Sequence, residues 1–407
     1  MPIKNVDPPQ QQLQPLIDLY NRGQFHRLIE QVKISLLEYP DDVALYNIQG
    51  AAYAAIQDLD NASDSYRRAL AINSGVAEVH NNLGTVIQDK GLLDEAIKSY
   101  HKALEINPDF ADAFCNLGNA HQQKGEPEAA IGFFRKALEL RPDNILAYYN
   151  MGNAFKDKEK YDQALDAYEE ALKINANFLE ALINKGIVLR ERGELDNALS
   201  SYERAIVISP NNPEVHNNIG IILQERGDFE SALHSYRTAL EFDSGYVDAY
   251  NNLGTALRET GALDEAKVAY QKALAINPDC AQLLNNLGVV LQEEGMLDEA
   301  MEHYRRAIDT MSNFAEAYNN LGSANEDLGD LDEAIKFFQQ ALRARPDFTE
   351  AKKNLGNAYI NNGQHEMARP ILDTFFDERS LAQSLECVYH LDSLDEFHKQ
   401  LLNIVER

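Results

Sequence analysis

The sequence is poor in cysteine and in basic residues. Its three cysteines, Cys115, Cys280 and Cys387, are far apart and show no metal-ligand or CxxC spacing, which favours a reducing compartment. Lysine and arginine number 37 against 65 acidic residues, and the resulting net charge of -28 repels nucleic acid and anionic lipid at long range. The composition therefore favours a neutral or basic partner and disfavours nucleic acid.

Long apolar segments are missing as well. No stretch approaches the roughly 18 apolar residues of a membrane-spanning helix. The N-terminal residues MPIKNVDPPQQQ contain no apolar core of the kind found in a signal peptide. We therefore expect a cytoplasmic protein without a membrane partner.

The motifs of common catalytic sites do not occur either. The sequence has no glycine-rich phosphate loop, no GxSxG elbow and no HExxH. Its histidines show no metal-ligand spacing; examples are His101, His121, His216, His234 and His303. We therefore expect no enzyme activity, no catalytic residues, no metal and no cofactor.

An internal repeat dominates what the sequence does contain. A chain of 407 residues would usually form two or three domains, and 44% apolar with 25% charged residues is typical of a folded protein. From residue 43 to residue 382, however, the sequence repeats every 34 residues without insertion or deletion, which gives ten units. Counted from Val43, the eighth place of each unit is glycine, the twentieth is alanine, and the twenty-fourth is aromatic in nine units. The eighth-place glycines are Gly50, Gly84, Gly118, Gly152, Gly186, Gly220, Gly254, Gly288, Gly322 and Gly356.

Each unit is predicted to form two antiparallel helices. Small residues at fixed places allow the helices to cross closely, and the aromatic ring fills the space beside them. A second glycine, such as Gly91 or Gly227, marks the turn between the helices. An aspartate after this turn is the expected N-cap of the second helix. These expected caps are Asp94, Asp264, Asp298 and Asp332.

The period and motifs such as NNLGTVIQDKGLLDEAIKSYHKALEINPDF resemble the tetratricopeptide repeat family. The resemblance implies an all-α fold, an α-solenoid in which antiparallel helix pairs build a right-handed superhelix. It also implies a protein interaction scaffold that binds peptides or proteins along a concave groove. The sequence then divides into a disordered tail (1–8), a degenerate repeat (9–42), ten full repeats (43–382) and a partial repeat that caps the C-terminal end (383–407).

Asparagine recurs on one face of the predicted first helices. The second, sixth, ninth and thirteenth places form one polar stripe, because they are spaced by four, three and four residues. The sixth place is asparagine in nine successive units, and we call these residues the asparagine row. They are Asn82, Asn116, Asn150, Asn184, Asn218, Asn252, Asn286, Asn320 and Asn354.

The asparagine row resembles the asparagine ladder in the repeat arm of O-linked N-acetylglucosamine transferases. That resemblance implies that the row lies on the concave side and holds the backbone of a bound peptide. A carboxamide suits this role, since it offers one acceptor and two donors to an extended chain. The alternative interpretation is that these asparagines serve local solvation or packing between repeats.

Acidic residues flank the asparagine row at the second and thirteenth places. Acids at the second place suit a helix N-terminus, whereas those at the thirteenth place lie near the opposite end of the helix, where the dipole does not favour them. The pattern therefore predicts an acidic groove that selects extended neutral or basic segments. The candidate groove acids are Glu191, Glu225, Glu259, Asp248 and Glu214.

The C-terminal sequence leaves a second function open. The stretch ARPILDTFFDERSLAQSLECVYHLDSLDEFHKQLL resembles the junction in long bacterial proteins where such an array precedes a glycosyltransferase, a sulfotransferase or a 2-oxoglutarate/Fe(II) oxygenase. The resemblance implies a substrate-recruiting arm of a multidomain or partner enzyme. The apolar residues near the end either fold back onto the array or mediate self-association or contact with an enzyme module. These residues are Leu401, Leu402, Ile404 and Val405.

Overall fold

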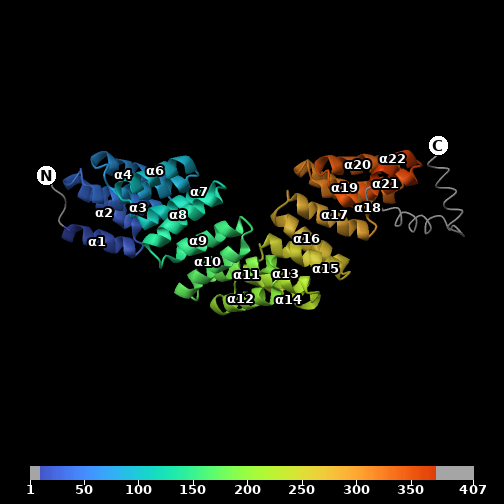
Figure 1. Cartoon of the computed structure of the whole chain (residues 1–407), viewed down its shortest axis with the longest axis horizontal. Helices are drawn as coiled ribbons and strands as arrows, with labels where there is room; N and C mark the ends of the chain where they lie inside the picture. Colours follow the sequence, from blue (N-terminus) through green and yellow to red (C-terminus); the bar gives the residue numbers. More distant parts are fainter. Residues whose placement is uncertain (1–9, 373–407) are drawn as a thin grey trace. The chain divides into compact units, whose positions relative to one another are not determined.

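The computed structural model describes residues 10–372, which form 22 α-helices and no strand (Figure 1). Helices that follow one another in sequence pack side by side as antiparallel pairs, so the predicted all-α solenoid is confirmed. The expected tail (1–8), the expected C-terminal cap (383–407) and the last ten residues of the final repeat lie outside the described residues.

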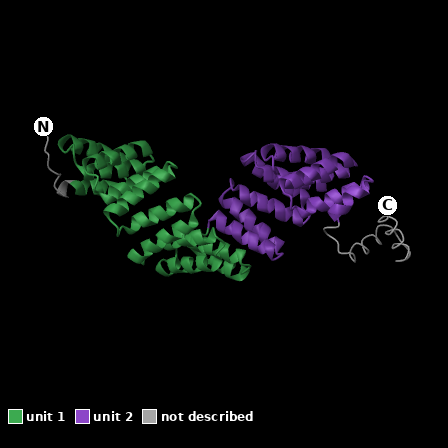
Figure 2. Ribbon diagram, turned by 45° about the horizontal axis from the view of Figure 1, so that its top comes forward, with its two compact units in different colours: residues 1–210 green, residues 211–407 purple. Residues whose placement is uncertain are grey.

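The chain forms two compact units, residues 1–210 and residues 211–407 (Figure 2). The boundary falls in the loop between two helix pairs, so each unit is built from whole pairs. The helices of the first unit are α1 (Gln10–Asn21), α2 (Phe25–Glu38), α3 (Val43–Ala55), α4 (Leu59–Ile72), α5 (Ala77–Asp89), α6 (Leu93–Ile106), α7 (Ala111–Gln123), α8 (Pro127–Leu140), α9 (Ile145–Lys156), α10 (Tyr161–Ile174), α11 (Leu179–Glu191) and α12 (Leu195–Ile208). Those of the second unit are α13 (Pro213–Glu225), α14 (Phe229–Phe242), α15 (Val247–Glu259), α16 (Leu263–Ile276), α17 (Ala281–Glu293), α18 (Leu297–Thr310), α19 (Ala315–Asp327), α20 (Leu331–Ala344), α21 (Thr349–Asn361) and α22 (His365–Leu372).

The turn inside each pair ends the first helix with a left-handed residue. Gly227, for example, has φ +77°, and the following N–H of Asp228 donates to the carbonyl of Leu223 at 2.9 Å. Glycine adopts this conformation without a steric penalty, which explains its recurrence at the turn. Gln57 and Glu159 occupy the same place in two repeats and are forced to φ +63° and +56°.

The predicted caps of the second helices are wrong by two residues. Asp94, Asp264, Asp298 and Asp332 are each the second residue of the helix, because the glycine is followed by a single residue before the helix begins. Their carboxylates still lie at the positive end of the helix dipole. The true N-cap is the residue between the glycine and the helix, and Asp228 at this place accepts the N–H of Ser231 at 3.2 Å.

The core of each pair depends on the absence of a side chain at the eighth place. A Cβ built on Gly220 would lie 2.6 Å from Cε1 of Tyr236, which is fully buried. The alanines at the twentieth and twenty-seventh places, such as Ala232 and Ala239, are also fully buried, and Ala232 shares a core cluster with the ring. The aromatic ring therefore lies directly on the backbone of the first helix, at a separation that no larger residue permits.

We expect Gly152→Ala to lower the midpoint of thermal unfolding. The new Cβ would lie 2.5 Å from Cε1 of the Tyr168 ring, and overpacking of this kind costs about 1–3 kcal/mol. The matched control is Gly132→Ala on the neighbouring helix α8, where nothing lies within 4 Å of the new Cβ. That change should raise the midpoint, because alanine has the higher helix propensity. Equal effects of the two substitutions in thermal denaturation followed by circular dichroism would contradict this packing.

Candidate functional site

The asparagine row joins successive repeats through side-chain hydrogen bonds. In the described residues, eight of its nine members donate from Nδ2 to a side chain of the preceding repeat. In six of these bonds the acceptor is Oδ1 of the asparagine at the fifth place of the preceding repeat, 35 residues earlier. The bonds are Asn82–Asn47 (3.1 Å), Asn116–Asn81 (2.9 Å), Asn252–Asn217 (3.0 Å), Asn286–Asn251 (2.9 Å), Asn320–Asn285 (2.9 Å) and Asn354–Asn319 (3.0 Å).

Three members of the row depart from this arrangement. Asn150 donates instead to the ninth-place Asn119 at 2.8 Å. Asn184 donates both to the ninth-place Asn153 at 2.8 Å and to the hydroxyl of the fifth-place Tyr149 at 3.0 Å. The amide nitrogen of Asn218 is buried and has no hydrogen-bond partner among the described residues. The row is therefore a repeat-to-repeat connection, as the packing interpretation expects, and every donating member except Asn184 uses only one of the two N–H groups of its amide.

The amides of the second unit line a cavity of about 500 Å³. Its wall combines three fifth-place and three sixth-place asparagines from α15, α17 and α19, with Arg258 and Phe348 also lining it. Its remaining lining includes two second-place acids, Glu316 and Glu350. The asparagines are Asn251, Asn252, Asn285, Asn286, Asn319 and Asn320. This volume lies in the range of ligand sites, and the amides give it donors and acceptors without net charge.

The predicted second-place acids of the second unit are exposed near the start of their helices. Glu214 is on α13 and Asp248 is on α15. Burial raises the pKa of Tyr246 to about 12, and the negative charges of Asp248 and Glu214 add to this effect. The two carboxylates therefore lie near the same tyrosine hydroxyl and make this edge of the unit negative.

The predicted thirteenth-place acids are exposed at the other end of the first helices. Glu191 belongs to the first unit and pairs with Arg190 at 2.8 Å, while Glu225 and Glu259 belong to the second. Eleven residues of helix rise about 16 Å, so the second-place and thirteenth-place acids border the asparagine row on opposite sides. Glu259 accepts a hydrogen bond from Nε2 of Gln224 at 2.8 Å, which leaves its charge unneutralised.

A three-residue relay connects the core tyrosines to these acids. The Tyr236 hydroxyl donates to Oε1 of Gln224 at 2.9 Å, and Gln224 then donates to Glu259 of the next repeat. A second relay in the same unit runs from Tyr304 to Gln292 at 2.9 Å and on to Asp327 at 2.7 Å. The twelfth-place glutamine thus satisfies a buried hydroxyl and stacks one repeat on the next.

We expect Tyr236→Phe to destabilise the protein by about 1 kcal/mol, because it removes one hydrogen bond and leaves the Oε1 of Gln224 without its donor. The matched control is Tyr66→Phe. Tyr66 occupies the same place in its repeat, but its hydroxyl makes no hydrogen bond with any described residue. The control should leave the unfolding midpoint unchanged or raise it. A larger loss for the control than for Tyr236→Phe in thermal denaturation would refute the relay.

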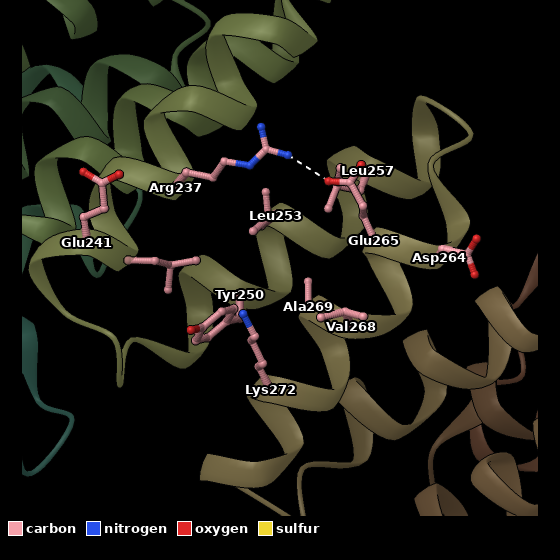
Figure 3. A pocket seen from close by; sticks show the side chains of 11 residues that line it. Arg237, Glu241, Tyr250, Leu253, Leu257, Asp264, Glu265, Val268, Ala269 and Lys272 are labelled. Atoms are coloured by element: carbon pink, nitrogen blue, oxygen red, sulfur yellow. Dashed lines mark hydrogen bonds and ion pairs between the residues drawn. The ribbon is translucent and has the colours of Figure 1, made fainter.

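A second cavity of the second unit lies among α14, α15 and α16 and has a volume of about 550 Å³ (Figure 3). It is largely apolar, with Leu253 and Val268 among its lining. Arg237 bridges to Glu265 at 2.9 Å, so its positive charge is already neutralised. None of the residues predicted to bind a ligand lines this cavity.

The fifth-place asparagines are the important residues that the sequence prediction missed. They supply the acceptors of the asparagine row, and Asn285 and Asn319 are 5% and 2% exposed. The signal was present as an Asn-Asn doublet at residues 81–82, 217–218, 251–252, 285–286 and 319–320. The second asparagine of each doublet was predicted to bind a ligand, whereas the first accepts a hydrogen bond from the asparagine-row member of the following repeat.

Within residues 10–372 the structure groups no histidine, cysteine, aspartate and glutamate side chains in a way that would hold a metal ion. The same part of the chain has no helix long and apolar enough to span a bilayer. Cys115 is buried, which raises the pKa of its thiol to about 11, and Cys280 is half-buried.

Comparison with protein families gives one long match and three short ones. Residues 110–317 match the family model of the cilia and flagella-associated protein 70 C-terminal domain, which covers half of the chain. Residues 88–125, 315–348 and 43–75 match models of single tetratricopeptide repeats. No curated protein matches the sequence.

Solved structures share the fold over most of the chain. The Cut9–Hcn1 assembly of the APC/C is 14% identical over 85% of this chain and 83% of that chain, with a TM-score of 0.51. Yeast Tom70 is 12% identical over 96% of this chain and 98% of that chain, with a TM-score of 0.50. YrrB, described as a TPR protein with an unusual peptide-binding site, is 30% identical over 46% of this chain and 97% of that chain, with a TM-score of 0.38.

Proposed function

Because the chain belongs to the tetratricopeptide repeat family represented by the model of the cilia and flagella-associated protein 70 C-terminal domain, we propose that it is a non-catalytic scaffold for other proteins. It binds extended, neutral or basic segments along the asparagine row of its first helices. Its action requires no cofactor, and its partners are neither nucleic acid nor membrane.

The amide-lined cavity of the second unit carries this proposal. Asn286 and Asn320 each spend one N–H on the preceding repeat, which fixes the position of the amide. The second N–H of each amide forms no hydrogen bond with a described residue, and both residues line the cavity of about 500 Å³. Amides held at a constant spacing suit the repeating N–H and C=O groups of an extended chain, and they distinguish little between side chains.

The acids on both sides of the asparagine row favour a basic partner over an acidic one. Glu214, Asp248 and Glu259 are exposed, and the protein carries a net charge of -28. Arg258 at the cavity is neutralised by Glu293 at 3.2 Å. A basic segment would therefore gain attraction on approach, and an acidic one would be repelled.

Two substitutions can separate the binding role of the asparagine row from its packing role. Both remove the same hydrogen bond, one at its donor and the other at its acceptor. Asn252→Ala removes an amide that lines the cavity, and Asn217→Ala removes its acceptor, which is 3% exposed and lies outside the cavity lining. Both changes should lower the unfolding midpoint by a similar amount. We expect only Asn252→Ala to weaken binding of a labelled neutral peptide in fluorescence anisotropy, by about three- to tenfold for one lost hydrogen bond.

Equal losses of affinity in the two variants would mean that the row acts only by holding the repeats together. A salt titration on the unmodified protein tests the charge preference. A lysine-containing peptide should bind more weakly as salt screens the acids, and a neutral peptide should be affected much less. Salt-independent binding of both peptides would remove the acidic groove from the proposal.

A further inference from the structure

A third cavity, in the first unit, marks a place where the repeat pattern is broken. It has a volume of about 420 Å³ and lies among the first helices α1, α3 and α5. Its wall is more apolar than that of the amide-lined cavity, since it includes Ile17, Ile48 and Ala51. Ile48 stands at the sixth place, where the next nine repeats have asparagine.

The twelfth place matters chemically here, because four of the ten repeats have the relay glutamine at this place (Gln88, Gln122, Gln224 and Gln292) and the first repeat has Ala54. Tyr66 and Asp89 stand at the places that Tyr236 and Glu259, or Tyr304 and Asp327, occupy in the complete relays. Both Tyr66 and Asp89 line the cavity. The two ends of the relay are present, and the carboxamide between them is missing.

Neither of these two groups forms a hydrogen bond with a side chain of the described residues. Tyr66 is 2% exposed, and its hydroxyl makes no hydrogen bond with a described residue. Asp89 forms no hydrogen bond or ion pair with the described part of the chain, and partial burial raises the pKa of its carboxyl. The Tyr66 hydroxyl opens onto the cavity and the Asp89 carboxyl is partly desolvated, so a ligand that offers an acceptor to the first and a donor to the second would bind to both.

We propose that this cavity binds a glutamine side chain of an extended partner segment, whose carboxamide takes the place of the missing twelfth-place glutamine. The ligand oxygen accepts the Tyr66 hydroxyl, and the ligand N–H donates to Asp89. Its methylene groups lie against Ile17, Ile48 and Ala51. The proposal deepens the proposed function, because the rest of the segment is held by the amides of the groove.

Competing side chains satisfy only part of this site. Leucine fills the apolar wall and leaves both polar groups unpaired. Glutamate has the right length but brings a negative charge beside Asp89 and Glu78, which both line the cavity. Lysine pairs with Asp89 and offers no acceptor to Tyr66. A preference for glutamine over leucine, glutamate and lysine would therefore identify the carboxamide as the group that the cavity binds.

The test compares four labelled peptides that are identical except for a central glutamine, leucine, glutamate or lysine, with the full-length protein in fluorescence anisotropy. We expect the glutamine peptide to bind about tenfold more tightly than the others. Equal affinity for all four would overturn the glutamine site and leave the proposed function intact. Failure of all four to bind would overturn both.

Two variants locate the preference in this cavity. Ala54→Gln supplies the carboxamide from within the chain, so it should abolish the glutamine preference and raise the unfolding midpoint, which rules out misfolding as the cause. Tyr66→Phe should reduce the preference. The matched control Tyr304→Phe lies in a complete relay of the other unit and should leave the preference unchanged. A glutamine preference that persists in Ala54→Gln would refute the assignment.

Discussion

The close approach of a tyrosine ring to a glycine backbone determines much of the rest of this structure. Without a Cβ at Gly220, the Tyr236 ring lies against the backbone of the first helix, and its hydroxyl donates to Gln224. That glutamine then donates to Glu259 of the next repeat. One missing side chain therefore fixes the packing within a pair, the stacking between pairs and the position of the Glu259 carboxylate. A repeat protein needs such a contact in every unit, because each unit contacts only its neighbours.

The hydrogen bonds between repeats explain why the asparagine row has two interpretations. An asparagine such as Asn286 uses one N–H to hold the preceding repeat through Asn251, and the bond also immobilises the amide. An immobilised amide loses less conformational entropy when it binds a ligand than a freely rotating one. Packing and binding are therefore compatible uses of one side chain, and the first improves the second.

The fold was predictable from the sequence because the period of 34 residues, the glycines and the alanines are local, repeated signals. The start of the second helices was predicted two residues late, since a carboxylate in the first turn and a carboxylate at the N-cap resemble each other in sequence and only the turn geometry separates them. The positions of the asparagine row and the acids were readable from their places in the repeat. Their partners were not, because the bonds between Asn320 and Asn285 or between Gln224 and Glu259 join residues 35 apart and depend on how repeats stack.

Departures from the repeat pattern are informative because the array tolerates them. Stability is distributed over many pairs, so a single repeat remains folded although Gln57 is held at φ +63° and Tyr66 lacks the glutamine of its relay. A side chain in the left-handed region costs about 1–2 kcal/mol. Glycine at the same place avoids this cost in eight of the ten repeats, so packing alone does not explain Gln57. The Tyr66 hydroxyl and the Asp89 carboxyl line one cavity without a hydrogen bond to a described side chain, and a ligand carboxamide that joins them would give Ala54 a physical reason.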